Sequence, residues 1–297
     1  MSYIFKLARR LAMVHLGLLA LGIGACSDTV APSRESPVDP HHASSLQNSG
    51  PISQSSNGIV TTGTPGHPNE PIGFVQLNTR PFNNKVENGW RDRGDWRFSI
   101  AQDGTAPVSP NNVGKALFPA GWIGGSGPIN TWYKLGNLRK NLYISFWIKL
   151  SSGWQGHKSG VNKILYIQIN NQNMVHLDAH GSGNSILRPD ITGQGMNENP
   201  VTRVLMPNVN TSVMIKRGQW EHWEVLLTAN TSGLPNGAAQ WWINGVQVGR
   251  YSNVNYVPAT GNNDWEVIKW NPVWGGVGDT VRNAQDMTID DIYISNK

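Results

Sequence analysis

The chain has 297 residues, of which 13 are Trp and 33 are Gly, and only 14% are charged. This length suits one large all-β domain or two small ones, and the composition is typical of an extracellular β-protein rather than a helical cytosolic one. The formal net charge is +5, but Lys6, Arg9 and Arg10 lie in a segment that we expect to be removed; 24 basic residues less these three leave 21, against 19 acidic ones. No basic run remains, so the sequence offers no surface for a nucleic-acid partner.

The first 25 residues are typical of a secretion signal. A positively charged segment precedes LAMVHLGLLALGIGA, an apolar stretch too short to span a membrane comfortably and followed by no stop-transfer pattern. Ile23, Gly24 and Ala25 stand before Cys26, the only cysteine. This pattern resembles the bacterial lipobox, in which the cysteine is lipidated; the alternative is a plain secretory signal with an incidental Cys. We therefore expect a lipoprotein of the bacterial cell envelope, held at the membrane by a lipid alone.

Residues 26–70 are rich in Ser, Pro, Gly and Asn and poor in apolar groups. Such a segment buries too little surface to offset its ordering entropy, so we expect a flexible tether. The remaining residues, 71–297, then form one folded domain, which we expect to be monomeric.

Two alternating stretches stand at the centre of this domain. Residues 142–150 alternate apolar residues with Tyr143, Ser145, Trp147 and Lys149, and residues 162–170 alternate in the same way, with Lys163, Leu165 and Ile167 expected on one face. The other face of each strand carries aromatic and amide groups. These are Tyr143, Trp147, Tyr166, Gln168 and Asn170. Aromatic rings stack on sugar C–H faces and amides bind hydroxyls, so these residues are candidates for substrate binding; Trp147 and Tyr166 are equally consistent with core packing.

The rest of the domain consists of short apolar runs broken by Gly, Pro and Asn. Strands are expected at 74–77, 96–101, 115–118, 142–150, 163–169, 174–179, 213–216, 220–229, 239–243, 247–251 and 287–295. Many short strands indicate a sandwich or barrel. Asn244-Gly245 predicts a tight hairpin, because both residues tolerate positive φ.

The stretch GQWEHWEVLLTAN, followed by AAQWWINGVQVGRY and the final MTIDDIYIS, resembles concanavalin A-like lectin and laminin-G-type domains. The resemblance implies an all-β fold, an antiparallel β-sandwich or jelly roll, whose concave sheet carries the ligand groove. It also implies that Trp241 and Ile243 face the core, which leaves Trp242 for the concave side. Trp242 would then join Trp147, Tyr143 and Tyr166 in a stacking platform.

Residues 113–170 resemble the family-14 polysaccharide lyases. Phe118-Pro119-Ala120-Gly121, the pair Gly124-Gly125, the strand 142–149 and the loop Gly160-Val161-Asn162-Lys163 match the pattern of that family in order. The resemblance implies that Lys163 is a functional groove residue. The sequence departs from the pattern afterwards: Met174-Val175-His176 replaces Ser-x-Arg, and Ile186-Leu187-Arg188-Pro189 replaces Tyr-x-Tyr.

A lyase that acts on uronate polymers must neutralise a carboxylate, remove the proton α to it and protonate the leaving oxygen. Candidate neutralising groups are Lys163, Arg188, Gln168 and Asn170, and candidate acids and bases are His176, His180, Tyr166 and Tyr143. The sequence MVHLDAH places His176, Asp178 and His180 on one strand face. By strand rise the two histidines stand about 13 Å apart, too far to share one metal ion.

Other chemistries find less support. Glu221 and Glu224 point to opposite faces of a regular strand, so the carboxyl pair of a glycoside hydrolase is absent, although Glu224 remains a candidate lone acid. We expect no cofactor and no catalytic metal. Asp290 and Asp291 are consistent with a structural Ca²⁺ site or with ordinary solubilising residues, which we favour.

The sequence therefore predicts a surface-anchored lipoprotein that binds a polysaccharide, with or without uronate units, in a concave groove. The alternative is a polysaccharide lyase that cleaves an acidic glycan by β-elimination, with Lys163, His176 and Tyr166 as its working groups. Protein adhesion through loops is a third hypothesis.

Overall fold

The computed structural model describes residues 66–108, 111–137, 139–169, 173–194, 204–257 and 263–297. The expected signal peptide, Cys26, most of the expected tether and Asn170 lie outside these ranges. Within them, no helix combines the length and the apolar character that a membrane span requires.

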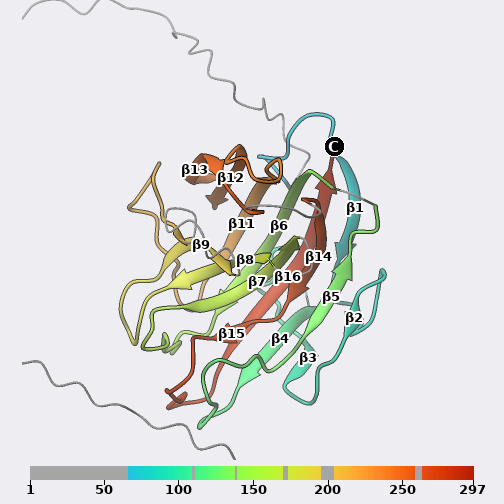
Figure 1. Ribbon diagram of the computed structural model, residues 1–297. Coiled ribbons are helices and arrows are strands. Elements are labelled where there is room, and N and C mark those ends of the chain that lie inside the picture. Colours follow the sequence, from blue (N-terminus) through green and yellow to red (C-terminus); the bar gives the residue numbers. More distant parts are fainter. Residues whose placement is uncertain (1–65, 109–110, 138, 170–172, 195–203, 258–262) are drawn as a thin grey trace, which may run out of the picture. The chain divides into compact units, whose positions relative to one another are not determined.

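The described chain is an antiparallel β-sandwich of two eight-stranded sheets (Figure 1), as the sequence predicts. The first, which we call the back sheet, has the order β13-β12-β11-β6-β16-β4-β3, and β1 pairs with β16. The second has the order β10-β9-β8-β7-β14-β5-β2, with β15 beside β7; we call it the groove sheet, because the cavities described below hollow its outer face.

The strands of the back sheet are β1 (Val75–Arg80), β3 (Phe98–Ala101), β4 (Val113–Phe118), β6 (Asn141–Leu150), β11 (Trp220–Thr228), β12 (Gly237–Ile243), β13 (Val246–Val254) and β16 (Gln285–Asn296). The strands of the groove sheet are β2 (Arg91–Asp92), β5 (Thr131–Lys134), β7 (Asn162–Ile169), β8 (Asn173–His180), β9 (Arg188–Gln194), β10 (Val204–Leu205), β14 (Trp265–Trp270) and β15 (Val273–Trp274).

Most strands with a clear alternating or apolar pattern are where the sequence predicts them. The exception is 213–216, which forms no strand; Ile215 makes only an isolated bridge to Leu187. The predictions omit the groove-sheet strands β2, β5, β9, β10, β14 and β15. Several of these are very short, and β14 carries a register shift between Trp265 and Val267 that disturbs its alternation.

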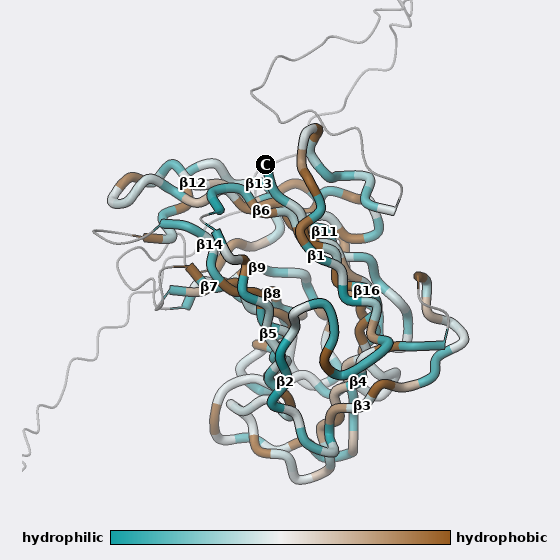
Figure 2. Tube along the Cα trace, turned by 90° about the vertical axis from the view of Figure 1, so that its right-hand side faces the viewer, coloured by the Kyte–Doolittle hydropathy of each residue, from teal (hydrophilic) through white to brown (hydrophobic). Residues whose placement is uncertain are grey.

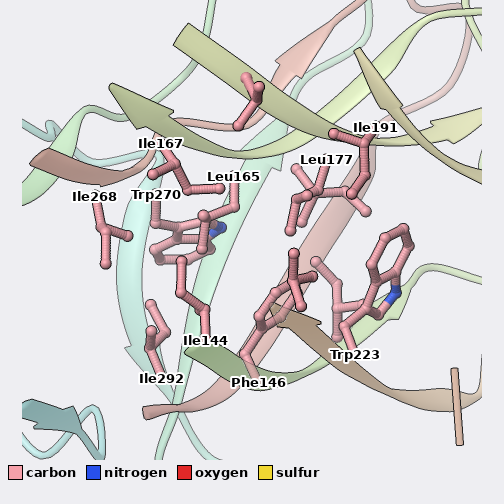
Figure 3. Packing of buried hydrophobic residues seen from close by; sticks show 14 of the residues in the cluster. Ile144, Phe146, Leu165, Ile167, Leu177, Ile191, Trp223, Ile268, Trp270 and Ile292 are labelled. Carbon is pink, nitrogen blue, oxygen red and sulfur yellow. The ribbon is translucent and has the colours of Figure 1, made fainter. Parts of the chain in front are cut away.

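The core lies between the two sheets, and hydropathy changes from residue to residue along the strands that enclose it (Figure 2). The back sheet contributes Ile144, Phe146 and Trp223, and the groove sheet contributes residues such as Leu165 and Trp270 (Figure 3). All five side chains are completely buried. Period-2 alternation thus produces one apolar face per sheet, and these two faces pack against each other.

Asn244-Gly245 forms the predicted hairpin between β12 and β13. Both residues have positive φ, 51° for Asn244 and 78° for Gly245. Two successive positive φ values match the twist of the flanking strands, so this local pattern favours the pairing of Ile243 with Val246 and of Trp242 with Gln247. The register then shifts, and Trp241 pairs with Gly249.

Residues 66–74 pack on the outer face of the back sheet, although the sequence assigns 66–70 to the tether. The Glu224 carboxylate accepts hydrogen bonds from the backbone N–H of Asn69, from Asn69 Nδ2 (both 2.8 Å) and from the Tyr143 hydroxyl (2.6 Å). His67 stacks on Tyr293 with ring centroids 3.7 Å apart. This segment therefore adds two hydrogen bonds from Asn69 to the one that the sheet itself supplies to Glu224 through Tyr143.

Replacing Asn69 by Ala should lower the free energy of unfolding by about 2 kcal/mol, because a hydrogen bond to a charged group contributes roughly 1.5–3 kcal/mol. Urea unfolding measures this loss. Asn137→Ala changes an exposed amide and serves as the control. Equal stability of the two variants would contradict a stabilising role for the Asn69–Glu224 contact.

Candidate functional site

Three cavities lie along the outer face of the groove sheet, with volumes of about 600, 640 and 310 Å³. The smallest is lined by Lys163, Tyr166 and Lys269 among others. Lys269 also lines the 600 Å³ cavity, so these two cavities are adjacent. The candidate site is this face of β7, β8, β9 and β14.

A register shift in β7 puts Lys163 on this face. The pairing of β7 with β8 shifts between Lys163 and Leu165, so that Lys163 lies opposite Asp178 and Tyr166 lies opposite His176. Directly paired residues of antiparallel strands point to the same side. Lys163 therefore faces outward with Tyr166, with Nζ 5.7 Å from the ring centroid of Tyr166. The expectation that Lys163 shares a face with Leu165 is wrong, because alternation does not reveal a β-bulge.

His176 and Asp178 form a buried pair at the centre of the site. His176 Nδ1 lies 2.9 Å from both carboxylate oxygens of Asp178, and Asp178 is completely buried. A neutral imidazole that donates its Nδ1 proton to a carboxylate keeps a lone pair on Nε2. The ring of His176 stands 5.4 Å from that of Tyr166, so a proton-accepting nitrogen and a phenol lie side by side.

Burial shifts the pKa values of the two other groups in opposite directions. Burial, and then the negative charge of Asp178, raises the pKa of the Tyr166 hydroxyl, which keeps its proton at neutral pH. Burial lowers the pKa of the Lys163 ammonium, while Asp178 acts in the opposite direction. The site thus combines a proton acceptor, a proton donor and a cation within neighbouring strand positions.

Asp190 lies beside this cluster, directly opposite Asp178 on β9. Its side chain is completely buried, no described residue donates a hydrogen bond to either of its oxygens, and His180 Nδ1 is 3.6 Å from Oδ2. Burial, followed by repulsion from Asp178, raises the pKa of Asp190 to about 7. Asp190 is therefore a carboxyl group that holds a proton over much of the acidic range.

Asp190→Asn should change how stability depends on pH. The folded state binds the Asp190 proton between pH about 4 and about 7, where the unfolded chain has released it. The wild type should therefore lose stability as pH rises across this window, by roughly 2–4 kcal/mol. The variant should match the wild type near the acidic end and exceed it above the window. Thermal unfolding at a series of pH values tests this, and parallel curves would contradict the raised pKa.

The other predicted groove residues lie on either side of the cluster. Gln168 lines the 600 Å³ cavity. His180 and Arg188 line the 640 Å³ cavity together with Lys158. Lys163, Tyr166, His176, Gln168, His180 and Arg188 thus share one sheet face.

Tyr143, Trp147 and Trp242 do not belong to this face, and the expected platform of four aromatic rings is not formed. Strand β6, which carries Tyr143 and Trp147, lies in the back sheet, whereas β7 lies in the groove sheet. Their polar faces point to opposite sides of the molecule. Tyr143 is fully buried and Trp242 nearly so, in one cluster with Tyr293 and Leu226 on the outer face of the back sheet. Alternation predicts two faces for each strand but does not show which sheet a strand joins.

A second polar cluster lies on the outer face of the back sheet. Ser145 Oγ is 2.7 Å from His222 Nε2, and His222 Nδ1 is 3.8 Å from Glu224 Oε2. The order of groups is that of a hydrolytic triad, but Ser145 is only 1% exposed and sits within a regular strand pair. Asn69 and Tyr143 already bind Glu224. Glu224 is therefore a structural carboxylate and not a lone acid open to a glycan.

Several residues of the groove are absent from the sequence predictions, among them Asp190, Lys269 and Trp132. Lys269 lies directly opposite both Tyr166 and Trp132. The sequence WEVIKW does not reveal β14 or its neighbours, because the paired residues are about 100 positions apart for β7 and more than 130 positions apart for β5. A pairing signal between distant positions would be needed to find them.

Among the described residues, no group of three or more His, Cys, Asp or Glu side chains is placed to hold a metal ion. Asp290 is completely buried and accepts a hydrogen bond from the backbone N–H of Val108 at 2.9 Å. Burial, and then the charge of Asp290, raises the pKa of Asp291 to about 6. Asp290 is thus a packed structural residue rather than the solubilising surface residue that we favour from the sequence.

No family profile and no curated protein sequence matches the chain. Its fold is similar to several solved structures. A mutant of the alginate lyase Aly36B, in complex with an alginate trisaccharide, has 13% sequence identity and a TM-score of 0.58 over 75% of this chain and 98% of that one. The endo-β-1,4-glucuronan lyase of the fungus Trichoderma reesei has 12% identity and a TM-score of 0.51 over 75% and 96%. The marine PL-14 alginate lyase of Aplysia kurodai has 9% identity and a TM-score of 0.54 over 75% and 100%. At such low identities these likenesses establish the jelly-roll fold.

Proposed function

We propose that the groove binds an acidic polysaccharide and cleaves it by β-elimination. The observation that carries the proposal is the His176–Asp178 pair beside Tyr166 and Lys163 on the outer face of the groove sheet. These groups supply the three requirements of the reaction: a base, an acid and a cation that stabilises developing negative charge.

The reaction begins at the uronate unit whose carboxylate lies against Lys163. His176 Nε2 takes the proton from the carbon α to the carboxylate, and Asp178 stabilises the resulting imidazolium through Nδ1. The electron pair of that C–H bond forms a carbon–carbon double bond, and the bond to the glycosidic oxygen at the β position breaks. Tyr166, which is protonated at neutral pH, gives its proton to the leaving oxygen. The products are a new chain end and an unsaturated uronate; no water is consumed.

The structural neighbours support this choice of substrate class. Aly36B was solved with an alginate trisaccharide, and the Trichoderma reesei protein is a glucuronan lyase. Their jelly roll is the one found here. Alginate and glucuronan are both uronate polymers, so a polymer of that class is the first substrate to test.

Binding without cleavage is a second candidate function, and β9 favours it. Where the family-14 pattern has Tyr-x-Tyr, this chain has Ile186-Leu187-Arg188-Pro189. Strand β9, which begins at Arg188, contains no tyrosine, and Arg188, Asp190 and Thr192 lie opposite His180, Asp178 and His176. If Tyr166 does not replace those tyrosines as the acid, the groove holds the polymer without breaking it.

Incubation with alginate, glucuronan and heparin-like polymers separates the two candidates. A lyase raises the ultraviolet absorbance through its unsaturated product, whereas a binding protein is retained on one polymer and yields no product. No product from any uronate polymer would contradict the lyase. Failure to be retained on any glycan would favour adhesion through loops.

The N-terminal pattern supports a lipid anchor at Cys26 for this groove domain in the cell envelope, with a polysaccharide outside the membrane as its partner. Cys26→Ser should abolish incorporation of labelled fatty acid and release the protein from the membrane fraction of a bacterial host. An unchanged membrane fraction would contradict the anchor and favour a plain secretion signal.

A further inference from the structure

The 600 Å³ cavity at the β5 side of the groove has no role in the proposed reaction. Its lining includes Arg93, Trp132, Lys134, Gln168 and Lys269. Two acidic residues, Asp264 and Glu266, line the same cavity beside the three cations Arg93, Lys134 and Lys269. Asp264 pairs with Lys140 at 3.2 Å. Cations and an aromatic ring thus gather on the same sheet face as His176.

Strand register connects this cavity to the reacting groups. Arg91, Trp132, Lys269, Tyr166, His176 and Thr192 are successive direct partners across β2, β5, β14, β7, β8 and β9. They form one row at right angles to the strands. Neighbouring strands lie about 4.8 Å apart, so Trp132 stands two strands, or about 10 Å, from Tyr166. A polymer that lies along this row reaches both side chains.

The ring of Trp132 is half-buried, and the Arg93 guanidinium carbon lies 5.5 Å from its centroid. An indole offers an apolar face to the C–H groups of a pyranose ring. Lys269, directly opposite on β14, supplies a cation beside that ring. Burial lowers the pKa of the Lys269 ammonium, and a carboxylate bound next to it acts in the opposite direction.

We propose that Trp132, Lys269 and Arg93 form a second sugar subsite, which stacks one uronate ring on the indole and pairs its carboxylate with Lys269. The inference rests on the proposed function, because it takes an acidic glycan as the ligand. It adds that the groove recognises a second carboxylated unit, to one side of the bond that is cleaved, and therefore prefers polymers long enough to span both positions.

The test compares Trp132→Ala with Trp147→Ala, which removes a half-buried Trp from the back sheet. Binding is measured by calorimetry with uronate oligosaccharides of increasing length, in a His176→Ala background in which turnover is slow. Trp132→Ala should weaken binding of long oligosaccharides about tenfold, which corresponds to the roughly 1.4 kcal/mol of a modest stacking contact. It should leave the shortest ligands unaffected. Trp132→Tyr should restore most of the loss, and Trp147→Ala should change nothing.

The outcomes distinguish the subsite from the proposed function. Equal binding of long oligosaccharides by Trp132→Ala and its parent overturns the subsite alone. Equal weakening for short and long ligands also overturns it, because Trp132 would then act at the reaction centre or on the fold. If the parent binds no acidic oligosaccharide, the proposed function itself fails. Trp132→Leu, compared with Trp132→Tyr, gives the same readout if the Ala variant does not fold.

Discussion

Replacing His176 by Ala should reduce the rate of polymer cleavage by about 10²–10⁴-fold, the usual contribution of a general base. His176 lies near Tyr166 and Lys163, and its Nδ1 is 2.9 Å from the Asp178 carboxylate oxygens. This contact leaves Nε2 available to accept a proton. The rate of formation of unsaturated product measures the effect. Because the side chain is only 3% exposed, thermal unfolding must accompany the kinetics.

Two further variants make this result specific. Asp178→Asn should also slow the reaction, because an amide cannot stabilise the imidazolium that forms on His176. His180→Ala, four residues along the same strand and facing a different cavity, should retain most of the turnover rate. Full activity in His176→Ala, with a folded protein, would contradict the assignment of the base. Equal loss in His176→Ala and His180→Ala would point to general damage of β8.

Replacing Trp223 by Ala should lower the free energy of unfolding by about 3–5 kcal/mol, the range for deleting a large buried aromatic side chain. Trp223 on β11 is completely buried and stacks on Phe146 of β6, with ring centroids 6.0 Å apart and planes 13° from parallel. Both rings lie between the sheets, so their loss would leave a cavity in the core (Figure 3). Denaturant unfolding provides the measurement.

Trp220→Ala is the matched control, because Trp220 begins the same strand and is only half-buried. Its ring lies against the Lys149 ammonium, 4.7 Å from the centroid, and such exposed contacts contribute about 0.5–1 kcal/mol. A loss of similar size in the two variants would contradict the larger contribution that burial gives Trp223.

The sequence predicts the fold well where the signal is local. Alternation identifies the buried faces of β6 and of most of β7, and Asn244-Gly245 identifies a hairpin. What it cannot supply is the partner of each strand. Strands β6 and β7 follow each other closely and share a pattern, yet they enter different sheets, which separates Tyr143 and Trp147 from Tyr166.

The candidate site is also predictable only in part: local patterns identify some of its residues, but not which residues lie next to each other. Lys163, Tyr166 and His176 can be named from the sequence, through a family resemblance and through alternation on β7 and β8. Their proximity depends on a register shift that a strict period of two does not predict. Trp132 and Lys269 reach the groove only because β5 and β14 pair across a separation of more than 130 residues. Non-local register, rather than residue type, determines that part of the site.

Identifying the chemical ends of the polymer fragments tests the central claim, cleavage by β-elimination, most directly. Digestion of alginate or glucuronan, followed by mass spectrometry of the fragments, separates elimination from hydrolysis. The reaction at His176 and Tyr166 predicts that each new non-reducing end is an unsaturated uronate, lighter by one water than the saturated end that hydrolysis leaves. Fragments with saturated new ends, or intact polymer after prolonged incubation with a protein that binds it, would contradict that chemistry.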